Sequence, residues 1–117
     1  MPHIHLETTA DLHENGAIPD ILEALVAELC KYDTIGAPSV KAYHSLRSNW
    51  VMGEGAPPGF AHCTVMILAG RPPELKKKIA AGMFEAMKSH FDMSMENNEI
   101  SLTLELRDMD KDTYHKL

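Results

Sequence analysis

The stretch FAHCTVMILAGRPPELKKKIAAGMFEAMKSHF, residues 60–91, carries the clearest fold signal of the chain. Phe60–Leu68 is short, apolar and rich in β-branched residues, which is typical of a buried strand. The sequence GRPPE at 70–74 then interrupts the chain, and proline suits the first turn of a helix. From about Pro73 to Phe91, apolar residues recur at helical spacing; they are Leu75, Ile79, Met83, Met87 and Phe91. We therefore predict a buried strand followed by an amphipathic helix.

The preceding half of the chain shows the same order of elements. Pro2–Glu7 alternates between apolar and polar residues, as a half-buried strand does. An apolar stripe predicts a helix over Ile18–Lys31, and the polar run Val40–Val51 is predicted to be extended. The Gly- and Pro-rich residues 53–59 form a loop between the two halves.

A final strand completes the second half. Glu99–Leu106 alternates cleanly, and the last eleven residues form a polar tail. Two βαβ halves in 117 residues predict a single α+β domain spanning 1–117, with a mixed four-stranded sheet and both helices on one face. Because apolar residues in the two terminal strands suggest that the other sheet face also needs covering, we expect a symmetric oligomer.

Composition narrows the function. The net charge is −6 and the isoelectric point is near 5.6, which argues against a nucleic-acid or anionic-membrane partner. Neither a signal peptide nor an apolar stretch of membrane-spanning length is present, so we expect a cytoplasmic protein. Cys30 and Cys63 form no CxxC pair and are expected to be reduced thiols in or near the core.

Pro2 is the first candidate for chemistry. Removal of Met1 would leave a secondary amine at the start of a buried strand. An α-amino group titrates near 7.7–8.0, and desolvation or a neighbouring cation lowers its pKa towards the range that suits a general base. If Met1 stays in place, the same nitrogen is an amide and accepts no proton. Since many chains begin with Met-Pro, this feature alone is weak.

Two cations are candidates for binding an anion. Arg71 follows Gly70 at a strand-to-helix junction, where a guanidinium and the backbone N–H groups of a helix start can bind a carboxylate. Lys41 lies early in the second predicted strand. Taken alone, either residue also fits a solvent-exposed position.

The histidines do not form a metal-binding motif. His3 and His5 would point to the same face of a strand, with His44 or His62 as a third ligand. No HExxH and no carboxylate at ligand spacing accompanies them. We therefore expect no metal site.

Six segments of the chain occur in the same order, and at nearly the same spacing, as in a known protein family. They are PHIHLE (2–7), WVMGEG (50–55), FAHCT (60–64), AGR (69–71), SHF (89–91) and SLTLE (101–105). As a set they resemble the 5-carboxymethyl-2-hydroxymuconate isomerase family of the tautomerase superfamily. No single segment is specific, but the collinear set covers nearly the whole chain.

The resemblance implies a fold and a mechanism. It implies a homotrimer of βαβ-βαβ protomers that works without metal or organic cofactor and moves a proton on a small unsaturated 2-hydroxy or 2-oxo dicarboxylate. By position, Pro2 matches the proline base and Arg71 the carboxylate-binding arginine. Lys41 falls where the family carries a second arginine, so the charge is kept but the bidentate fork is lost.

Two other functions stay open. One is a different tautomerase-superfamily activity, such as phenylpyruvate-type enol–keto tautomerisation, decarboxylation or dehalogenation, on the same Pro2 scaffold. The other is a non-catalytic trimeric protein that binds a ligand or serves as a scaffold.

Overall fold

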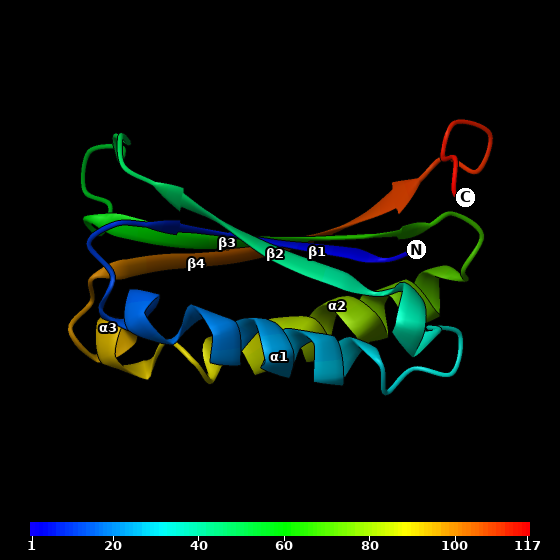
Figure 1. Cartoon of the computed structure of the whole chain (residues 1–117). Helices are drawn as coiled ribbons and strands as arrows, with labels where there is room; N and C mark the ends of the chain where they lie inside the picture. Colours follow the sequence, from blue (N-terminus) through cyan, green and yellow to red (C-terminus); the bar gives the residue numbers. More distant parts are fainter.

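A mixed four-stranded sheet with helices packed on one face forms the protein, whose computed structural model describes residues 1–117 (Figure 1). The strands are β1 (His3–Thr9), β2 (Lys41–Arg47), β3 (Gly59–Leu68) and β4 (Ile100–Met109). The helices are α1 (Ile18–Leu29), α2 (Pro73–Lys88) and the short α3 (Asp92–Glu96), with 3-10 turns η1 (His13–Ala17) and η2 (Ala37–Ser39). The predicted α+β class and the placement of both long helices on one face are confirmed.

Each half of the chain contributes one parallel pair of strands. The strand order is β2-β1-β3-β4, with β1 parallel to β2 and β3 parallel to β4. The central pair, β1 and β3, is antiparallel. The starts of β1 and β2 and the ends of β3 and β4 therefore meet at one end of the sheet, where both chain termini lie (Figure 1).

The core lies between the sheet and the two long helices. It contains 17 buried apolar residues, and side chains of β1 and β3 alternate into it. Its fully buried members include Ile4, Leu6, Val65, Ile67, Leu25, Leu29, Ile79, Met83 and Met87. Cys63 is part of this core, and burial raises the pKa of its thiol to about 12. Cys30 is half-buried, and neither cysteine is in a disulfide.

Three boundaries differ from the sequence prediction by three residues or more, and the other ends agree within two. The second strand ends at Arg47 rather than Val51, because β2 pairs only with β1 and its partner ends at Thr9. The second long helix ends at Lys88 rather than Phe91, and the chain turns before α3 begins. The last strand continues to Met109, since β3 offers it a partner as far as Leu68.

The sheet face opposite the helices is more polar than we expected. The apolar positions of β1 and β4 point towards the helices, and β1 presents His3, His5 and Glu7 on the open face. Arg47 of β2 pairs there with Glu7, with 2.6 Å between Nη2 and Oε2. Phe60 and Met66 are half-buried apolar residues on the same face. The argument that the terminal strands make this face apolar was therefore wrong, because their apolar residues supply the core.

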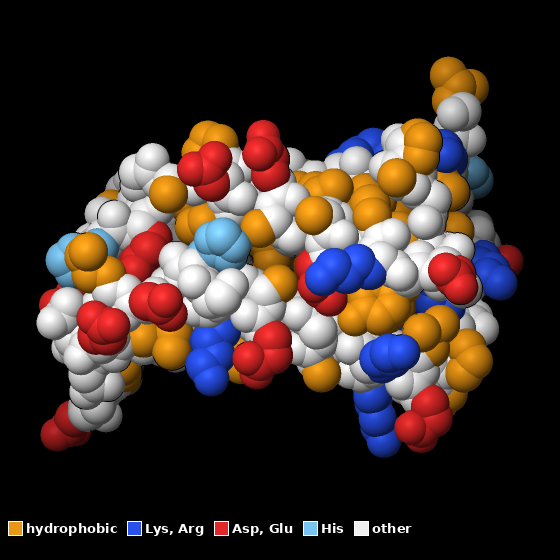
Figure 2. Space-filling view, turned by 90° about the horizontal axis from the view of Figure 1, so that it is seen from below, with side chains coloured by type: hydrophobic (Ala, Val, Ile, Leu, Met, Phe, Trp, Pro, Cys, Tyr) orange, Lys and Arg blue, Asp and Glu red, His pale blue; other side chains and the backbone are white.

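The outer side of the helical layer carries charges of both signs with apolar patches between them (Figure 2). No helix has both the length and the apolar character required to cross a membrane.

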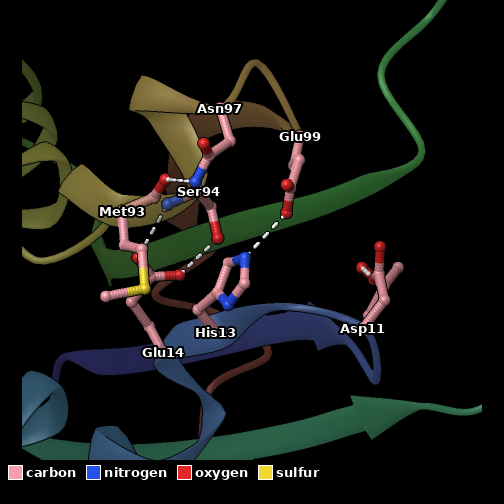
Figure 3. A network of polar contacts seen from close by, with 8 residues as sticks. Asp11, His13, Glu14, Met93, Ser94, Asn97 and Glu99 are labelled. Carbon is pink, nitrogen blue, oxygen red and sulfur yellow. Dashed lines mark hydrogen bonds and ion pairs between the residues drawn. The ribbon is translucent and has the colours of Figure 1, made fainter.

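A polar network joins the two halves at the end of the sheet away from the termini (Figure 3). Glu14 of η1 accepts hydrogen bonds from the backbone N–H (3.1 Å) and hydroxyl (2.6 Å) of Ser94 in α3. His13 Nε2 lies 2.8 Å from Glu99 Oε2. Since η1 follows β1 and α3 precedes β4, these contacts connect the loops at that end.

Candidate active site

Four parts of the chain meet at the terminal end of the sheet: the N-terminus, the loop between α1 and β2, the end of β3 with the turn after it, and the C-terminal tail. The N–H of Lys41 at the start of β2 donates to the Pro2 carbonyl at 3.0 Å, and β3 ends beside them at Leu68. A cavity of about 450 Å³ opens here, within the size range of small-molecule sites. Its lining contains no acidic side chain and consists of Met1, Pro2, Thr34, Gly36, Pro38, Ser39, Leu68, Arg71 and Lys116.

Arg71 is held in this cavity by three hydrogen bonds. Its Nε donates to Thr34 Oγ1 (3.0 Å), its Nη1 to the Leu68 carbonyl (3.0 Å) and its Nη2 to the Thr34 carbonyl (2.9 Å). Gly70, with a φ of 119°, allows the tight turn that places Arg71 there. Because a guanidinium has five N–H donors, two remain free for an anionic ligand.

Pro2 is buried at the cavity, directly after Met1. With Met1 in place the Pro2 nitrogen is an amide, and the Met1 amine is the titrating group. Its pKa is lowered from 8.0, chiefly by burial and then by the charges of Lys116, Lys41 and Arg71. This end of β1 therefore disfavours a protonated amine, which is the property that a general base at this place requires.

Lys41 lies next to the cavity without lining it. Its Nζ donates to the Ser39 carbonyl at 3.2 Å, and its side chain is exposed. The structure thus brings Pro2 and Arg71 into one cavity and leaves Lys41 at its margin.

Sequence reasoning missed Thr34, Tyr114 and Lys116. Lys116 lines the cavity, and the Tyr114 hydroxyl lies 2.9 Å from His3 Nε2. Thr34 positions Arg71 from the loop after α1. An aromatic residue and a cation near the end of a polar tail were the available signals, but they did not reveal where the tail folds.

The histidines of the sheet are engaged with hydroxyl groups. His5 Nε2 lies 2.8 Å from Ser45 Oγ, and His62 Nδ1 lies 2.7 Å from Thr103 Oγ1. His44 Nε2 lies 2.7 Å from Thr8 Oγ1. No three His, Cys, Asp or Glu side chains are grouped so that they could hold a metal ion.

The protein has a tandem βαβ sheet with a cationic cavity beside its N-terminal residues. This combination places it in the tautomerase superfamily. The chain belongs to the 5-carboxymethyl-2-hydroxymuconate isomerase family, whose model matches residues 2–117. Membership in this family implies a small-molecule substrate.

Individual relatives agree with this assignment. The chain is 24% identical over 110 residues to 5-carboxymethyl-2-hydroxymuconate Delta-isomerase of Escherichia coli, covering 93% of this chain and 87% of that protein. It is similar to the crystal structure of a 5-carboxymethyl-2-hydroxymuconate isomerase from Deinococcus radiodurans R1, with a TM-score of 0.90, 26% identity, and coverage of 99% of this chain and 88% of that one. A fused 4-OT described as a wild-type symmetric trimer shares the fold, with a TM-score of 0.69, 23% identity, and coverage of 93% and 86%.

Proposed function

We propose that this protein is a cofactor-free isomerase that moves a proton on an unsaturated 2-hydroxy or 2-oxo carboxylate, with the amine of Pro2 as the base. The observation that carries the proposal is the shared cavity of Pro2 and Arg71, whose lining holds no acidic side chain. Family membership supports the isomerase class. The proposed substrate resembles 5-carboxymethyl-2-hydroxymuconate, from the breakdown of aromatic compounds.

The reaction needs a base and a positive environment. The neutral Pro2 nitrogen takes a proton from carbon or from an enol oxygen, forming an N–H bond as the C–H or O–H bond breaks. The electrons spread over the conjugated system as a dienolate-like anion, which the surrounding cations stabilise. Return of the proton to a different carbon completes the isomerisation and restores the neutral amine.

Arg71 and Lys41 are proposed to bind substrate carboxylates. The three contacts of Arg71 to Thr34 and Leu68 orient its guanidinium before a ligand arrives, which lowers the entropy cost of binding. Lys41 lies at the cavity margin and offers a point charge.

The position of Lys41 also favours a second candidate. Because Lys41 does not line the cavity, it binds a second carboxylate of the substrate less tightly than a lining residue would. A smaller enol acid with one carboxylate is therefore a second candidate substrate for the same Pro2 base. Phenylpyruvate-type tautomerisation, decarboxylation and dehalogenation are the activities to compare. A scaffold without catalysis would show none of them.

We also propose a cytoplasmic homotrimer. The half-buried Phe60 and Met66 on the open sheet face are suited to burial against neighbouring copies. A 117-residue protomer with 23 buried residues gains stability from that additional burial.

The test is a panel of enols followed by ultraviolet absorbance, with 5-carboxymethyl-2-hydroxymuconate, 2-hydroxymuconate and the phenylpyruvate enol as substrates. Pro2→Ala should lower kcat/KM by about 100-fold or more, because general acid–base catalysis contributes that much. Pro19→Ala, at an exposed position in α1, serves as the matched control and should leave kcat/KM unchanged. Equal rates for Pro2→Ala and the parent protein would refute the proposal.

A further inference from the structure

A tyrosine of the C-terminal tail contacts a histidine of β1 beside the N-terminus. After β4 the chain turns at Asp110, whose carbonyl accepts hydrogen bonds from the N–H groups of Thr113 and Tyr114, at 3.2 and 3.1 Å. This turn brings the C-terminus above the N-terminus (Figure 1). Tyr114 is half-buried there, and its hydroxyl lies 2.9 Å from His3 Nε2 and 3.4 Å from the Met1 carbonyl oxygen.

The directions of these contacts follow from the protons that are available. A tyrosine hydroxyl has one proton, so Tyr114 donates to one of its two neighbours and accepts from the other. The Met1 carbonyl oxygen only accepts, so both contacts are satisfied when His3 Nε2–H donates to Tyr114 and Tyr114 donates to Met1. His3 Nδ1 is then the acceptor, and the Tyr43 hydroxyl lies 3.5 Å from it. The three side chains thus form one chain of hydrogen bonds that ends at the Met1 carbonyl.

The surroundings of His3 favour the neutral ring that this direction requires. Burial, followed by the positive charges of Lys41 and the N-terminal amine, lowers the pKa of His3. The rings of Tyr43 and Tyr114 meet its imidazole edge-on, with 6.1 and 5.9 Å between the ring centroids. At neutral pH the proton of the Tyr114 hydroxyl therefore points away from His3 and towards the N-terminus.

The acceptor of this proton marks a place for a ligand oxygen. The Met1 carbonyl carbon is bonded to the Pro2 nitrogen, so its oxygen lies two bonds from the proposed base. Met1 and Pro2 both line the cavity. Removal of Met1 takes the acceptor away from Tyr114, and an oxygen of a substrate bound against the Pro2 nitrogen can then accept the same hydrogen bond.

We infer that Tyr114 is a further catalytic residue, which donates a hydrogen bond to the C2 oxygen of the substrate, and that His3 and Tyr43 are positioning residues for its hydroxyl. This inference rests on the proposed role of Pro2. When the Pro2 nitrogen takes a proton from the substrate, the electron pair of the broken bond moves into the conjugated system and negative charge builds on the C2 oxygen. Tyr114 keeps its own proton and donates it in a hydrogen bond that strengthens as the oxygen becomes anionic.

Kinetics of the chain without Met1 test the donor. Tyr114→Phe keeps the ring and loses the hydroxyl, so it should lower kcat by about 100-fold and leave KM within about twofold, because the contact is strongest in the transition state. Tyr32→Phe is the matched control. This tyrosine is also half-buried, but its hydroxyl contacts Glu28 and the Lys78 carbonyl between α1 and α2, so kcat should not change.

Two substitutions of His3 test the positioning role. His3→Gln keeps an N–H donor for Tyr114 and should retain kcat within about threefold, whereas His3→Leu removes the donor and should lower kcat by about tenfold, because a misdirected catalytic group is less effective. Tyr43→Phe should lower kcat by only about twofold, since it acts on Tyr114 through His3. Equal losses in His3→Gln and His3→Leu would show that His3 has only a structural role.

Binding of an inert anion tests the donor without turnover. Oxalate places an anionic oxygen on the carbon next to a carboxylate, as the dienolate does. Calorimetry on the chain without Met1 should show that Tyr114→Phe binds oxalate about tenfold more weakly than the parent protein, because a hydrogen bond to a charged group is lost. Tyr32→Phe should bind oxalate as the parent protein does.

The outcomes separate this inference from the proposed base. Full kcat in Tyr114→Phe would overturn the inference, as would oxalate binding that is absent in the parent protein or unchanged in Tyr114→Phe. If Pro2→Ala retains full activity while Tyr114→Phe loses activity and oxalate affinity, the base is wrong and the donor stands. If Pro2→Ala is inactive and Tyr114→Phe is fully active, the base stands and the donor is wrong.

Discussion

Arg71 is the residue whose geometry most strongly indicates a binding role. Three of its five N–H donors contact the protein, at 2.9 to 3.0 Å, and its charge faces a cavity that no carboxylate shares. A structural arginine would be expected to have an acidic partner, as Arg47 has in Glu7. Arg71 has no acidic partner in the protein, which supports the proposal that it binds an anionic ligand.

Arg71→Lys should therefore weaken substrate binding. Lysine keeps the charge but cannot contact Thr34, Leu68 and a carboxylate in one plane. We expect kcat/KM to fall by about tenfold to 100-fold, mainly through KM, in steady-state kinetics. Arg107→Lys is the matched control, because the side-chain hydrogen bond of Arg107 goes to the exposed Glu105 and Arg107 does not line the cavity. A similar loss in both variants would contradict the assignment.

His44 gives a prediction about pH. Burial, and secondarily the charge of His5, lower the pKa of His44 below its ordinary 6.5. As the pH falls below 6.5, the unfolded chain takes up a proton at His44 that the folded chain resists. The free energy of unfolding should consequently decrease with falling pH, until the folded state is protonated too.

Urea unfolding at pH 7.5 and pH 5.5 measures this effect. His44→Gln should show a smaller loss of stability between the two pH values than the parent protein. Some loss should persist, because the pKa of His3 is also lowered, by burial first and then by Lys41 and the N-terminal amine. An unchanged pH dependence in His44→Gln would contradict the prediction.

Single residues of the site were predictable only where local sequence determines their position. Arg71 follows a glycine between a strand and a helix, and Pro2 starts a strand, so both could be placed from their neighbours. Lys116 reaches the cavity, and Tyr114 reaches His3 beside it, because β4 runs parallel to β3 and a turn at Asp110 sends the tail back. The pattern of apolar and polar residues in the tail does not predict that it folds back towards the N-terminus.

At the scale of elements, the short η1 and α3 segments connect the two halves of the protein. Glu14 accepts two hydrogen bonds from Ser94, which is fully buried, at 2.6 and 3.1 Å (Figure 3). Because α3 has five residues, it is too short to be stable alone. Its position depends on such tertiary contacts.

Glu14→Gln should destabilise the protein by about 1–2 kcal/mol, since an amide accepts weaker hydrogen bonds than a carboxylate. Chemical denaturation is the measurement. Glu23→Gln on the exposed side of α1 serves as the control and should change the free energy of unfolding by less than about 0.5 kcal/mol. Equal stability of the two variants would show that the contact to Ser94 contributes little.

Element types were predictable and some element ends were not. Hydrophobic patterning identified both long helices and the strands β1, β3 and β4, because each buries apolar residues in the same core. The polar β2 was predicted only as an extended run. The end of β2 at Arg47 depends on where its partner β1 stops, which is a property of pairing. Phe91 lies in the turn between α2 and α3 and is buried in the core. Because it also falls at helical spacing after Met87, the sequence pattern predicted a helix that extends beyond its actual end at Lys88.

At the scale of the whole molecule, two βαβ halves place a cavity with a cationic lining at one end and leave one sheet face open. The open face combines His3, His5 and Glu7 with the half-buried Phe60 and Met66. A homotrimer that buries this face would cover these apolar residues while the helical layer stays in solvent.

Met66→Lys should therefore dissociate the trimer, because it would bury an unpaired charge between copies. Sedimentation velocity should show three copies for the parent protein and a shift towards single protomers for the variant, with unchanged circular dichroism. Ala27→Lys on the exposed side of α1 should remain trimeric. A parent protein that sediments as a single protomer at micromolar concentration would contradict the assembly.

The central claim is that the free nitrogen of Pro2 is the base, and one sample can test it. Protein that retains Met1, made with methionine aminopeptidase inhibited, is assayed with 5-carboxymethyl-2-hydroxymuconate before and after the purified aminopeptidase removes Met1, with mass spectrometry following the cleavage. We predict that the isomerisation rate rises by about 100-fold or more as the amide becomes an amine. Equal rates before and after complete cleavage would contradict the account.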